Sequence, residues 1–216
     1  MLLVLKVSGH LYKYPFKIVE LMSVLEFLTS NGIGIAVVPG GSIFADSVRE
    51  LQRVTGFNDD VAHWMAIKAM EVYGLLLKGF SKNFVEAYSL EDITEALNNK
   101  LIPIIMPYKL LRTYNELPHS WDITSDSISV YVAHLLNANL VALGKIVEGI
   151  VGFNGEIIKS TKIDVVLKFV EDELDPYTLK LAKEFKIPIA VFNILKPQLL
   201  NKITKLELDN YTLILP

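Results

Sequence analysis

The sequence contains no cysteine, and this absence excludes several kinds of chemistry. Without a thiol there is no disulfide, no cysteine nucleophile and no zinc site built on cysteine. The lack of cysteine is typical of a cytoplasmic protein, and we expect that location. The four histidines also show no close ligand spacing such as H-x-x-x-H. The sequence therefore predicts no metal site made by its own side chains.

Long apolar runs and clustered charge of one sign are missing as well. No run reaches the roughly 18 uncharged residues that a membrane helix needs, and we expect a soluble protein without a membrane partner. The net charge is −3 and the lysines are scattered, so no basic surface for a nucleic-acid partner is predicted. Hydrophobic residues nevertheless make up 51% of the chain, which predicts fully buried strands and a homo-oligomer.

Apolar strands alternate with amphipathic helices along all 216 residues, with no linker between them. This alternation predicts a single α/β domain, residues 1–216, whose mostly parallel sheet is covered on both sides. The expected strands are residues 2–7, 33–38, 101–106, 140–143, 189–192 and 212–215. The expected helices are residues 16–29, 44–54, 59–76, 90–98, 124–136 and 176–185, and segments 165–170 and 197–203 continue the alternation. In the third of these helices, Asp59 or Asp60 is the expected cap, and the expected core stripe is Ala62, Met65, Ala66, Ala69, Val72, Tyr73 and Leu76. Residues 108–121 show no clear period, which is typical of a segment that borders a site.

The first strand contains a lysine, Lys6, among apolar residues. A buried ammonium is costly unless anions meet it, so Lys6 predicts a nearby carboxylate, a bound phosphate or both. Gly9 follows where the chain turns at the carboxyl end of the strand, the edge at which parallel sheets bind ligands. The alternative is a lysine at a sheet edge that extends to solvent beside an ordinary turn glycine.

A second glycine turn, Gly40-Gly41-Ser42, follows the second strand and precedes a helix. Helix N-termini and glycine turns present free N–H groups to anions, so this turn is a second candidate phosphate site. A purely structural loop explains the same residues equally well. No G-x-x-x-x-G-K-[ST] sequence is present, so the chain has no Walker loop.

The segment Thr124-Ser125-Asp126 opens a later helix. Thr124 or Ser125 as cap, with Asp126 in the first turn, satisfies ordinary helix chemistry. Because Lys6 requires an anion, Asp126 is also a candidate partner for its ammonium. The histidine inside the long third helix, His63, fits a buried structural residue, whereas His10 directly after Gly9 is better placed to touch a ligand.

Taken together, Lys6-Val7-Ser8-Gly9, the residues 37–41, the helix that begins near Asp59 and residues 123–127 resemble the amino-acid kinase superfamily, whose fold is that of carbamate kinase. The nearest likeness is to its archaeal small-molecule branch, near uridylate kinase and aminomethyl-furanmethanol phosphate kinase. The resemblance implies a three-layer α/β/α sandwich around about eight mostly parallel strands. It also implies that an acceptor-binding half, about residues 1–120, precedes a nucleotide-binding half, about residues 121–216.

The resemblance implies roles for these residues in ATP-dependent phosphoryl transfer to a small anionic acceptor, a phosphate or a carboxylate. Lys6 and Gly9 would bind the ATP phosphates, and Asp126 would orient Lys6. Magnesium would be held mainly by the nucleotide phosphates. The implied acceptor site comprises Gly40, Gly41, Ser42 and Ser125. Lys180 would be the second catalytic lysine, and Lys145, Val147 and Gly149 would bind nucleotide.

The nucleotide-binding half departs from the family pattern in the segment Lys145-Ile146-Val147-Glu148-Gly149. Family members usually carry a Thr-Asp/Lys-Val-Asp-Gly turn there. Three hypotheses follow: a small-molecule kinase, a binding or regulatory homologue with a degenerate ATP site, or a doubly wound domain whose glycine turns are structural. Nucleotide binding separates the first two, and the clustering of Lys6, Gly9, Gly40, Gly41 and Asp126 in one cleft separates both from the third.

Overall fold

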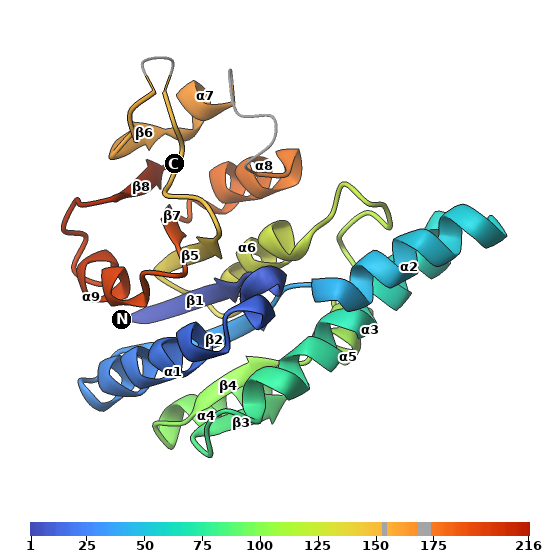
Figure 1. Ribbon diagram of the computed structural model, residues 1–216, viewed down its shortest axis with the longest axis horizontal. Helices are drawn as coiled ribbons and strands as arrows, with labels where there is room; N and C mark the ends of the chain where they lie inside the picture. The colour runs from blue at the N-terminus through green and yellow to red at the C-terminus, as the bar shows by residue number, and fades with distance from the viewer. Residues whose placement is uncertain (153–154, 168–173) are drawn as a thin grey trace.

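The computed structural model describes residues 1–152, 155–167 and 174–216, and within them an eight-stranded sheet forms the centre of the molecule (Figure 1). The strand order is β3-β4-β2-β1-β5-β7-β8-β6, and only the β7/β8 pair is antiparallel. The strands are β1 (Leu2–Val7), β2 (Gly34–Pro39), β3 (Phe84–Ala87), β4 (Ile102–Ile105), β5 (Leu140–Lys145), β6 (Ser160–Lys162), β7 (Ile189–Asn193) and β8 (Tyr211–Leu215). The predicted α/β class and mostly parallel sheet are confirmed.

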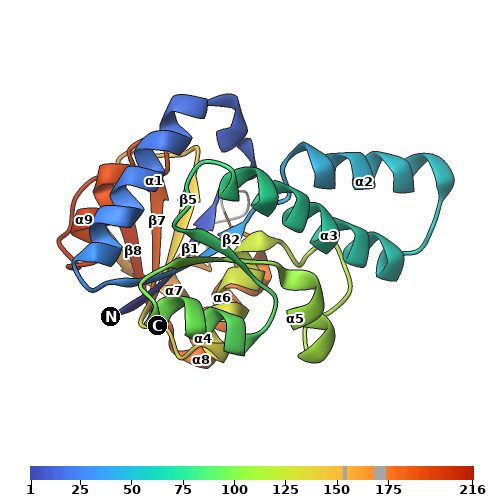
Figure 2. The ribbon, with the colours of Figure 1, turned by 90° about the horizontal axis from the view of Figure 1, so that it is seen from below.

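Helices lie on both faces of this sheet (Figure 2). The α-helices are α1 (Pro15–Ser30), α2 (Ser42–Thr55), α3 (Asp59–Lys78), α4 (Leu90–Asn98), α5 (Pro107–Thr113), α6 (Ser125–Leu135), α7 (Ile163–Val166), α8 (Pro176–Phe185) and α9 (Leu200–Ile203). Two short 3-10 helices are η1 (Gly9–Lys13) and η2 (Pro197–Leu199). Helices α1 and α9 cover one face, and α4, α6 and α8 cover the other (Figure 2). None of the described helices is both long and apolar enough to cross a membrane.

Side-chain alternation along β1 decides where Lys6 points. Successive residues of a strand face opposite sides of the sheet, so Leu3, Leu5 and Val7 enter the core beneath α1. Val4 enters the core beneath α6 on the other side. Lys6 comes two residues after Val4 and therefore also faces α6. It is the last residue but one of the strand.

The projecting α2–α3 pair differs from the predicted core pattern. The expected apolar stripe of α3 holds only in part, because Ala62, Ala69 and Tyr73 are buried whereas Val72 and Leu76 are exposed. The buried face is rotated toward Trp64, Ile67, Met70 and Leu77. Helix α2 lies along α3 and not over the sheet (Figure 2). This contact changes which side of α3 is buried.

Some elements were missed or misplaced by the sequence analysis. β3 and β6 were not predicted, and residues 108–113 of the segment without a clear period belong to α5. Helix α3 is capped by Asn58, whose side chain accepts a hydrogen bond from Val61 N, instead of by the predicted Asp59 or Asp60. The expected element at residues 165–170 falls partly outside the described residues.

Candidate active site

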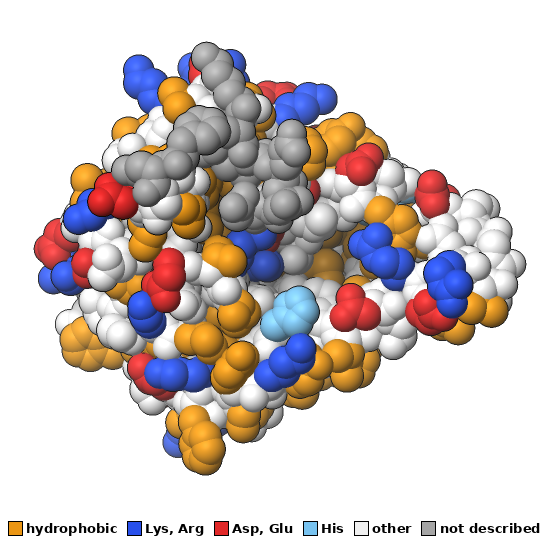
Figure 3. All heavy atoms as spheres, turned by 45° about the horizontal axis from the view of Figure 1, so that its top comes forward, with side chains coloured by type: hydrophobic (Ala, Val, Ile, Leu, Met, Phe, Trp, Pro, Cys, Tyr) orange, Lys and Arg blue, Asp and Glu red, His pale blue; other side chains and the backbone are white. Residues whose placement is uncertain are grey.

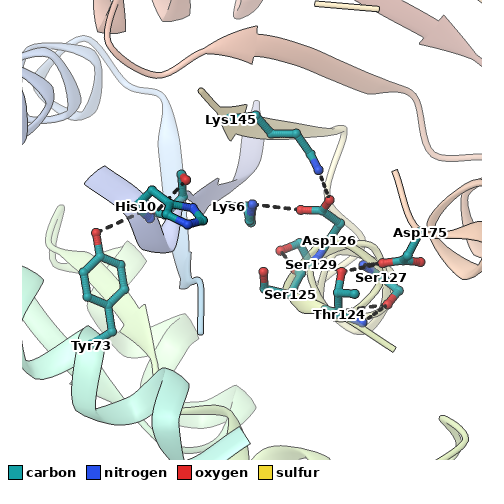
Figure 4. A network of polar contacts seen from close by, with 11 residues as sticks. Lys6, His10, Tyr73, Thr124, Ser125, Asp126, Ser127, Ser129, Lys145 and Asp175 are labelled. Carbon is teal, nitrogen blue, oxygen red and sulfur yellow. Dashed lines mark hydrogen bonds and ion pairs between the residues drawn. The ribbon is translucent and has the colours of Figure 1, made fainter. Parts of the chain in front are cut away.

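Two lysines meet one buried aspartate at the carboxyl ends of β1 and β5 (Figure 4). Lys6 Nζ lies 3.0 Å from Asp126 Oδ1, and Lys145 Nζ lies 2.5 Å from Asp126 Oδ2. Lys6 and Lys145 belong to neighbouring parallel strands, whereas Asp126 comes from the first turn of α6. The predicted pairing of Lys6 with Asp126 is therefore present in the structure. We refer to these three residues as the lysine–aspartate triad.

Burial sets the electrostatics of the triad. The side chains of Lys6 and Asp126 are only 9% and 5% exposed. Burial lowers the pKa of Lys6 below its ordinary value, and the charge of Asp126 opposes that effect. Burial also disfavours the charged form of Asp126, but the two ammonium groups outweigh it and lower the pKa of the carboxyl. The triad keeps one net positive charge, which an incoming phosphate can neutralise.

The Lys6 ammonium has three N–H bonds, and its ion pair with Asp126 Oδ1 occupies at most one of them. The ammonium therefore keeps N–H bonds that can point toward another oxygen in the cleft. Lys145, at 19% side-chain exposure, lies closer to the opening. The arrangement provides two fixed cations around one site where negative charge can develop.

The two glycine turns touch each other beside the triad. A Cβ atom on Gly9 would lie 2.3 Å from the backbone nitrogen of Ser42, and one on Gly40 would lie 2.6 Å from the backbone nitrogen of Gly9. Gly40 N also donates a hydrogen bond to Val7 O at 2.9 Å. Tyr73 Oη of α3 donates to Ser8 O at 3.1 Å and holds the first turn in place (Figure 4). Close backbone approach thus explains both glycines, and their predicted contacts with phosphate groups stay predictions.

The N-terminus of α2 is open toward the cleft. Gly41 is the N-cap residue and supplies no side-chain acceptor to the first helical N–H groups. Those N–H groups have no partner inside the helix, and the helix dipole adds positive potential there. Gly41 and Ser42 both line the cleft. This helix end therefore presents free N–H groups of the kind that bind phosphate, and its role as a phosphate site stays a prediction.

The start of α6 is held by side chains from two helices. Thr124 accepts a hydrogen bond from Asp126 N and forms a capping box with Ser127. Thr124 Oγ1 donates in turn to Asp175 Oδ2 at 2.5 Å, and Asp175 Oδ1 accepts from Thr178 N of α8. Asp175 therefore links the N-termini of α6 and α8. This link fixes the turn that presents Asp126 to both lysines.

A cleft of about 740 Å³ lies over these groups. In the space-filling view, basic side chains lie at the bottom of a hollow beside a histidine (Figure 3). The predicted residues that line the cleft are Lys6, Gly9, Gly41, Ser42, Ser125, Asp126, Lys145 and Val147. The cleft also contains His10, Asp46 and Asp175. Lys6, Gly9, Gly41 and Asp126, four of the five residues expected to share one cleft, line it. Gly40 does not line it but lies against Gly9 in the adjoining turn, and this clustering favours a ligand site over glycine turns that are purely structural.

Two residues with predicted roles lie apart from the cleft. Lys180 is exposed on α8, and its Nζ lies 5.1 Å from the centroid of the Tyr177 ring. The structure therefore does not bring Lys180 to the cleft as the sequence predicted, and the second lysine that lines the cleft is Lys145. Gly149 has φ 159° and packs against Thr212, whose Oγ1 would lie 2.8 Å from an added Cβ. Its position indicates a role in backbone packing.

The acidic residue of the altered 145–149 segment, Glu148, has partners of its own. Glu148 accepts hydrogen bonds from Lys196 Nζ at 2.8 Å and from Asn193 Nδ2 at 3.0 Å. The interaction with Lys196 is the main cause that lowers the pKa of Glu148. Glu148 thus ties the segment after β5 to the end of β7.

Sequence reasoning missed Asp175 and underestimated Lys145. Asp175 precedes Pro176, and an Asp before a proline at a helix start is a signal for an N-cap. The register of β5 against β1 places Lys145 one position beyond the partner of Val7. That register cannot be read from the sequence, although a lysine ending an apolar strand is the same signal that identified Lys6.

The residues of the cleft suit the phosphates of a nucleotide better than they suit a metal ion. Two cations, two glycine turns and a free helix N-terminus suit phosphate groups. Among the described residues, no group of three or more His, Cys, Asp or Glu side chains is arranged to hold a metal ion. Asp46 and Asp175 line the cleft as single carboxylates. A magnesium ion bound here with a nucleotide would therefore take mostly phosphate and water ligands.

The chain is similar to known proteins in sequence and in structure. Residues 1–193 match the model of the amino acid kinase family. The chain is 30% identical over 198 residues to [5-(aminomethyl)furan-3-yl]methyl phosphate kinase of Methanocaldococcus jannaschii, covering 89% of this chain and 88% of that relative.

Solved structures of uridylate kinases share the fold. UMP kinase of Ureaplasma parvum has a TM-score of 0.78 at 19% identity, with both chains covered completely. Uridylate kinase of Archaeoglobus fulgidus has a TM-score of 0.76 at 16% identity, covering 99% of this chain and 100% of that one. The family match extends over the triad, both glycine turns and the start of α6. The predicted family is thereby confirmed, and the chain belongs to the amino acid kinase family.

Proposed function

We propose that the protein is an ATP-dependent kinase that transfers a phosphoryl group to the phosphate of a small acceptor. The observation that carries the proposal is the lysine–aspartate triad at the floor of the cleft, beside both glycine turns. Membership of a kinase family supports the phosphotransferase class. The archaeal relative, which is named as a kinase of a phosphate ester, favours a phosphate over a carboxylate acceptor.

In the proposed reaction the acceptor phosphate oxygen attacks the γ-phosphorus of ATP, a new P–O–P bond forms, and ADP leaves. The N-terminus of α2, with Gly41 and Ser42, binds the acceptor phosphate in the half formed by residues 1–120. The half formed by residues 121–216 binds ATP, with Lys145 and Val147 at its phosphate end. Lys6 lies between the two and stabilises the transferred group, whose oxygens carry the charge in the transition state.

Asp126 has an orienting role in this proposal. Its carboxylate holds both ammonium groups near the transferred phosphoryl group, because their mutual repulsion would otherwise separate them. Magnesium, when bound, would be held chiefly by the nucleotide phosphates and water, and it would neutralise charge on those phosphates. Gly9 contributes its small size, which lets the two turns approach each other.

Calorimetry and product analysis test the proposal together. We expect Mg-ATP to bind the purified protein, and ADP to form when a small phosphate monoester is added. Lys6→Ala should abolish ADP formation while the far-ultraviolet circular dichroism stays that of the native protein. Binding of ATP without turnover on any phosphate or carboxylate would instead favour the regulatory homologue, and no binding at millimolar ATP would contradict the nucleotide site altogether.

We further propose that the chain forms a homo-oligomer in the cytoplasm. The exposed side of α3 supports this, because Val61, Val72, Leu75 and Leu76 are each at least 39% exposed along one helix. Leu75→Glu should shift the sedimentation equilibrium of the purified protein toward a smaller species. An unchanged mass would contradict an interface at α3. The cytoplasmic location is supported by the absence of cysteine.

A further inference from the structure

A small side chamber opens from the acceptor side of the cleft, and its volume is about 140 Å³. The residues that line both the cleft and the chamber are Gly41, Ala45, Thr124 and Ser125. The chamber therefore begins where the N-terminus of α2 would hold the acceptor phosphate. A group attached to that phosphate can enter the chamber without crossing the triad.

One wall of the chamber is Trp121, which two residues of α2 hold in place. Trp121 Nε1 donates a hydrogen bond to Gln52 Oε1 at 2.6 Å. The guanidinium carbon of Arg49 lies 4.1 Å from the centre of the Trp121 ring system, in a cation–π contact. Trp121 comes from the stretch between α5 and α6 that has no regular structure, so these two contacts fix a ring that the local backbone does not.

The inner part of the chamber is nearly uncharged. His63 lines it and is only 6% exposed. Burial, and then the neighbouring His119, lower the pKa of His63 to about 4, so its imidazole is neutral at pH 7. The other inner walls are apolar side chains of α3 and α6, namely Ile67, Met70 and Ile128. Among the residues that the structure describes, no carboxylate lines the chamber, and Arg49 is the one charged residue that does.

We propose that this chamber holds a single small ring of the acceptor, and that Trp121 sets the size limit for that ring. Phosphorylation of the acceptor rests on the proposed kinase function, whereas binding of the ring in the chamber does not. A cavity of about 150 Å³ accommodates one benzene molecule, so the chamber has room for one ring. A nucleoside, with a base and a sugar, exceeds this volume. The flat indole and the neutral imidazole favour an unsaturated ring, since aromatic groups gain energy by stacking.

Intrinsic fluorescence tests the binding without ATP. The chain has two tryptophans, and Trp64→Phe leaves Trp121 as the only one. Trp64 Nε1 has no hydrogen-bond partner in the described part of the chain, so this substitution breaks no hydrogen bond of that atom there. We expect benzyl phosphate to change the Trp121 emission saturably, at concentrations about tenfold below those needed for methyl phosphate. Uridine monophosphate binding as tightly as benzyl phosphate would overturn the size limit, and equal binding of methyl and benzyl phosphate would overturn the ring site.

Enlarging the chamber gives a result that misfolding cannot mimic. Trp121→Ala should weaken benzyl phosphate about tenfold by calorimetry and should admit the two-ring 2-naphthylmethyl phosphate, which the native chamber excludes. Trp121→Phe keeps an aromatic wall and should restore the preference for benzyl over methyl phosphate. Arg53→Ala serves as the matched control, because Arg53 lies one turn from Arg49 on α2 but pairs with Glu50 outside the chamber.

Failure of the proposed kinase function and failure of the chamber assignment give different results. If no acceptor is phosphorylated but benzyl phosphate still binds in a Trp121-dependent manner, the kinase function is wrong and the chamber stands. If phosphate esters are phosphorylated with the same preference in native protein and Trp121→Ala, the kinase function stands and the chamber assignment is wrong.

Discussion

Replacing Asp126 by asparagine removes the anion that holds Lys6 and Lys145 together, and the cost can be worked out from the structure. The two ammonium nitrogens lie 3.0 and 2.5 Å from opposite oxygens of the carboxylate. At a separation of roughly 6 Å and an effective dielectric constant of about 20, two unit charges repel by about 3 kcal/mol. Breaking a buried ion pair costs about 3 to 5 kcal/mol in measured cases. We therefore expect Asp126→Asn to lower the free energy of unfolding by about 3 to 5 kcal/mol.

The loss in Asp126→Asn should depend on pH in a defined direction. Burial already lowers the pKa of Lys6, and removing the carboxylate lowers it further. Between that lowered value and the ordinary lysine pKa of about 10.4, the unfolded chain binds more protons than the folded protein. Stability of the variant therefore rises with pH through this window, and the deficit against the native protein shrinks from pH 7 to pH 10. In the native protein the lowered pKa of Asp126 has its effect in acid, where its contribution is lost as pH falls below about 4.

Urea denaturation followed by circular dichroism at pH 7 and pH 10 measures both effects. Adding Lys6→Met to Asp126→Asn should recover much of the lost stability, because the buried unpaired cation is gone. Lys196→Met is the control, since its ion pair with Glu148 is about half exposed and exposed pairs contribute only about 0 to 1 kcal/mol. A loss below about 1 kcal/mol in Asp126→Asn, or a loss that is the same at both pH values, would refute the electrostatic reasoning.

Three further predictions concern the turns, the second lysine and the link between α6 and α8. Gly9→Ala should lower kcat/KM about 100-fold, because its Cβ would lie 2.3 Å from Ser42 N and displace a turn; native-like kinetics would show that the turns do not position substrate. Lys145→Ala should lower kcat by about 100-fold or more in a coupled ADP assay, whereas Lys180→Ala on the outside of α8 should retain the native rate; the reverse pattern would return the second catalytic role to Lys180. Asp175→Asn should lower the free energy of unfolding by about 1 to 2 kcal/mol in urea denaturation, as expected for a lost helix cap, and an unchanged midpoint would show that the cap contributes nothing.

Much of the fold could be predicted from sequence because the strands are continuous apolar runs. β1, β2, β5 and β7 are buried on both faces, and such runs stand out between helical patterns. β3 was missed because its four residues include Glu86, which pairs with Lys78, and a short strand at a sheet edge has little pattern. The stripe of α3 was misjudged because α2 lies against it, a tertiary contact that periodicity does not contain.

Some residues of the site could likewise be predicted from the sequence, and others could not. Lys6 could be found because a cation in an apolar strand breaks a local rule, and Asp126 because that cation needs a carboxylate. The two glycine turns could be found because each follows an apolar strand. Lys145 could not be placed beside them from sequence, because its position depends on the register of β5 against β1. The chamber formed around Trp121 was equally hidden, since it joins residues of α2, α3 and α6 that lie far apart in the chain.

Phosphorus-31 nuclear magnetic resonance tests the central claim most directly, because it identifies the bond that is made. The purified protein, Mg-ATP and benzyl phosphate are incubated with the native chain and with Lys6→Ala in parallel. The account predicts that the native chain consumes the γ-phosphate signal of ATP and produces ADP together with the paired resonances of a new diphosphate ester, and that Lys6→Ala produces neither. Conversion of ATP to ADP and free phosphate alone would contradict it. Equal product from Lys6→Ala would contradict it as well.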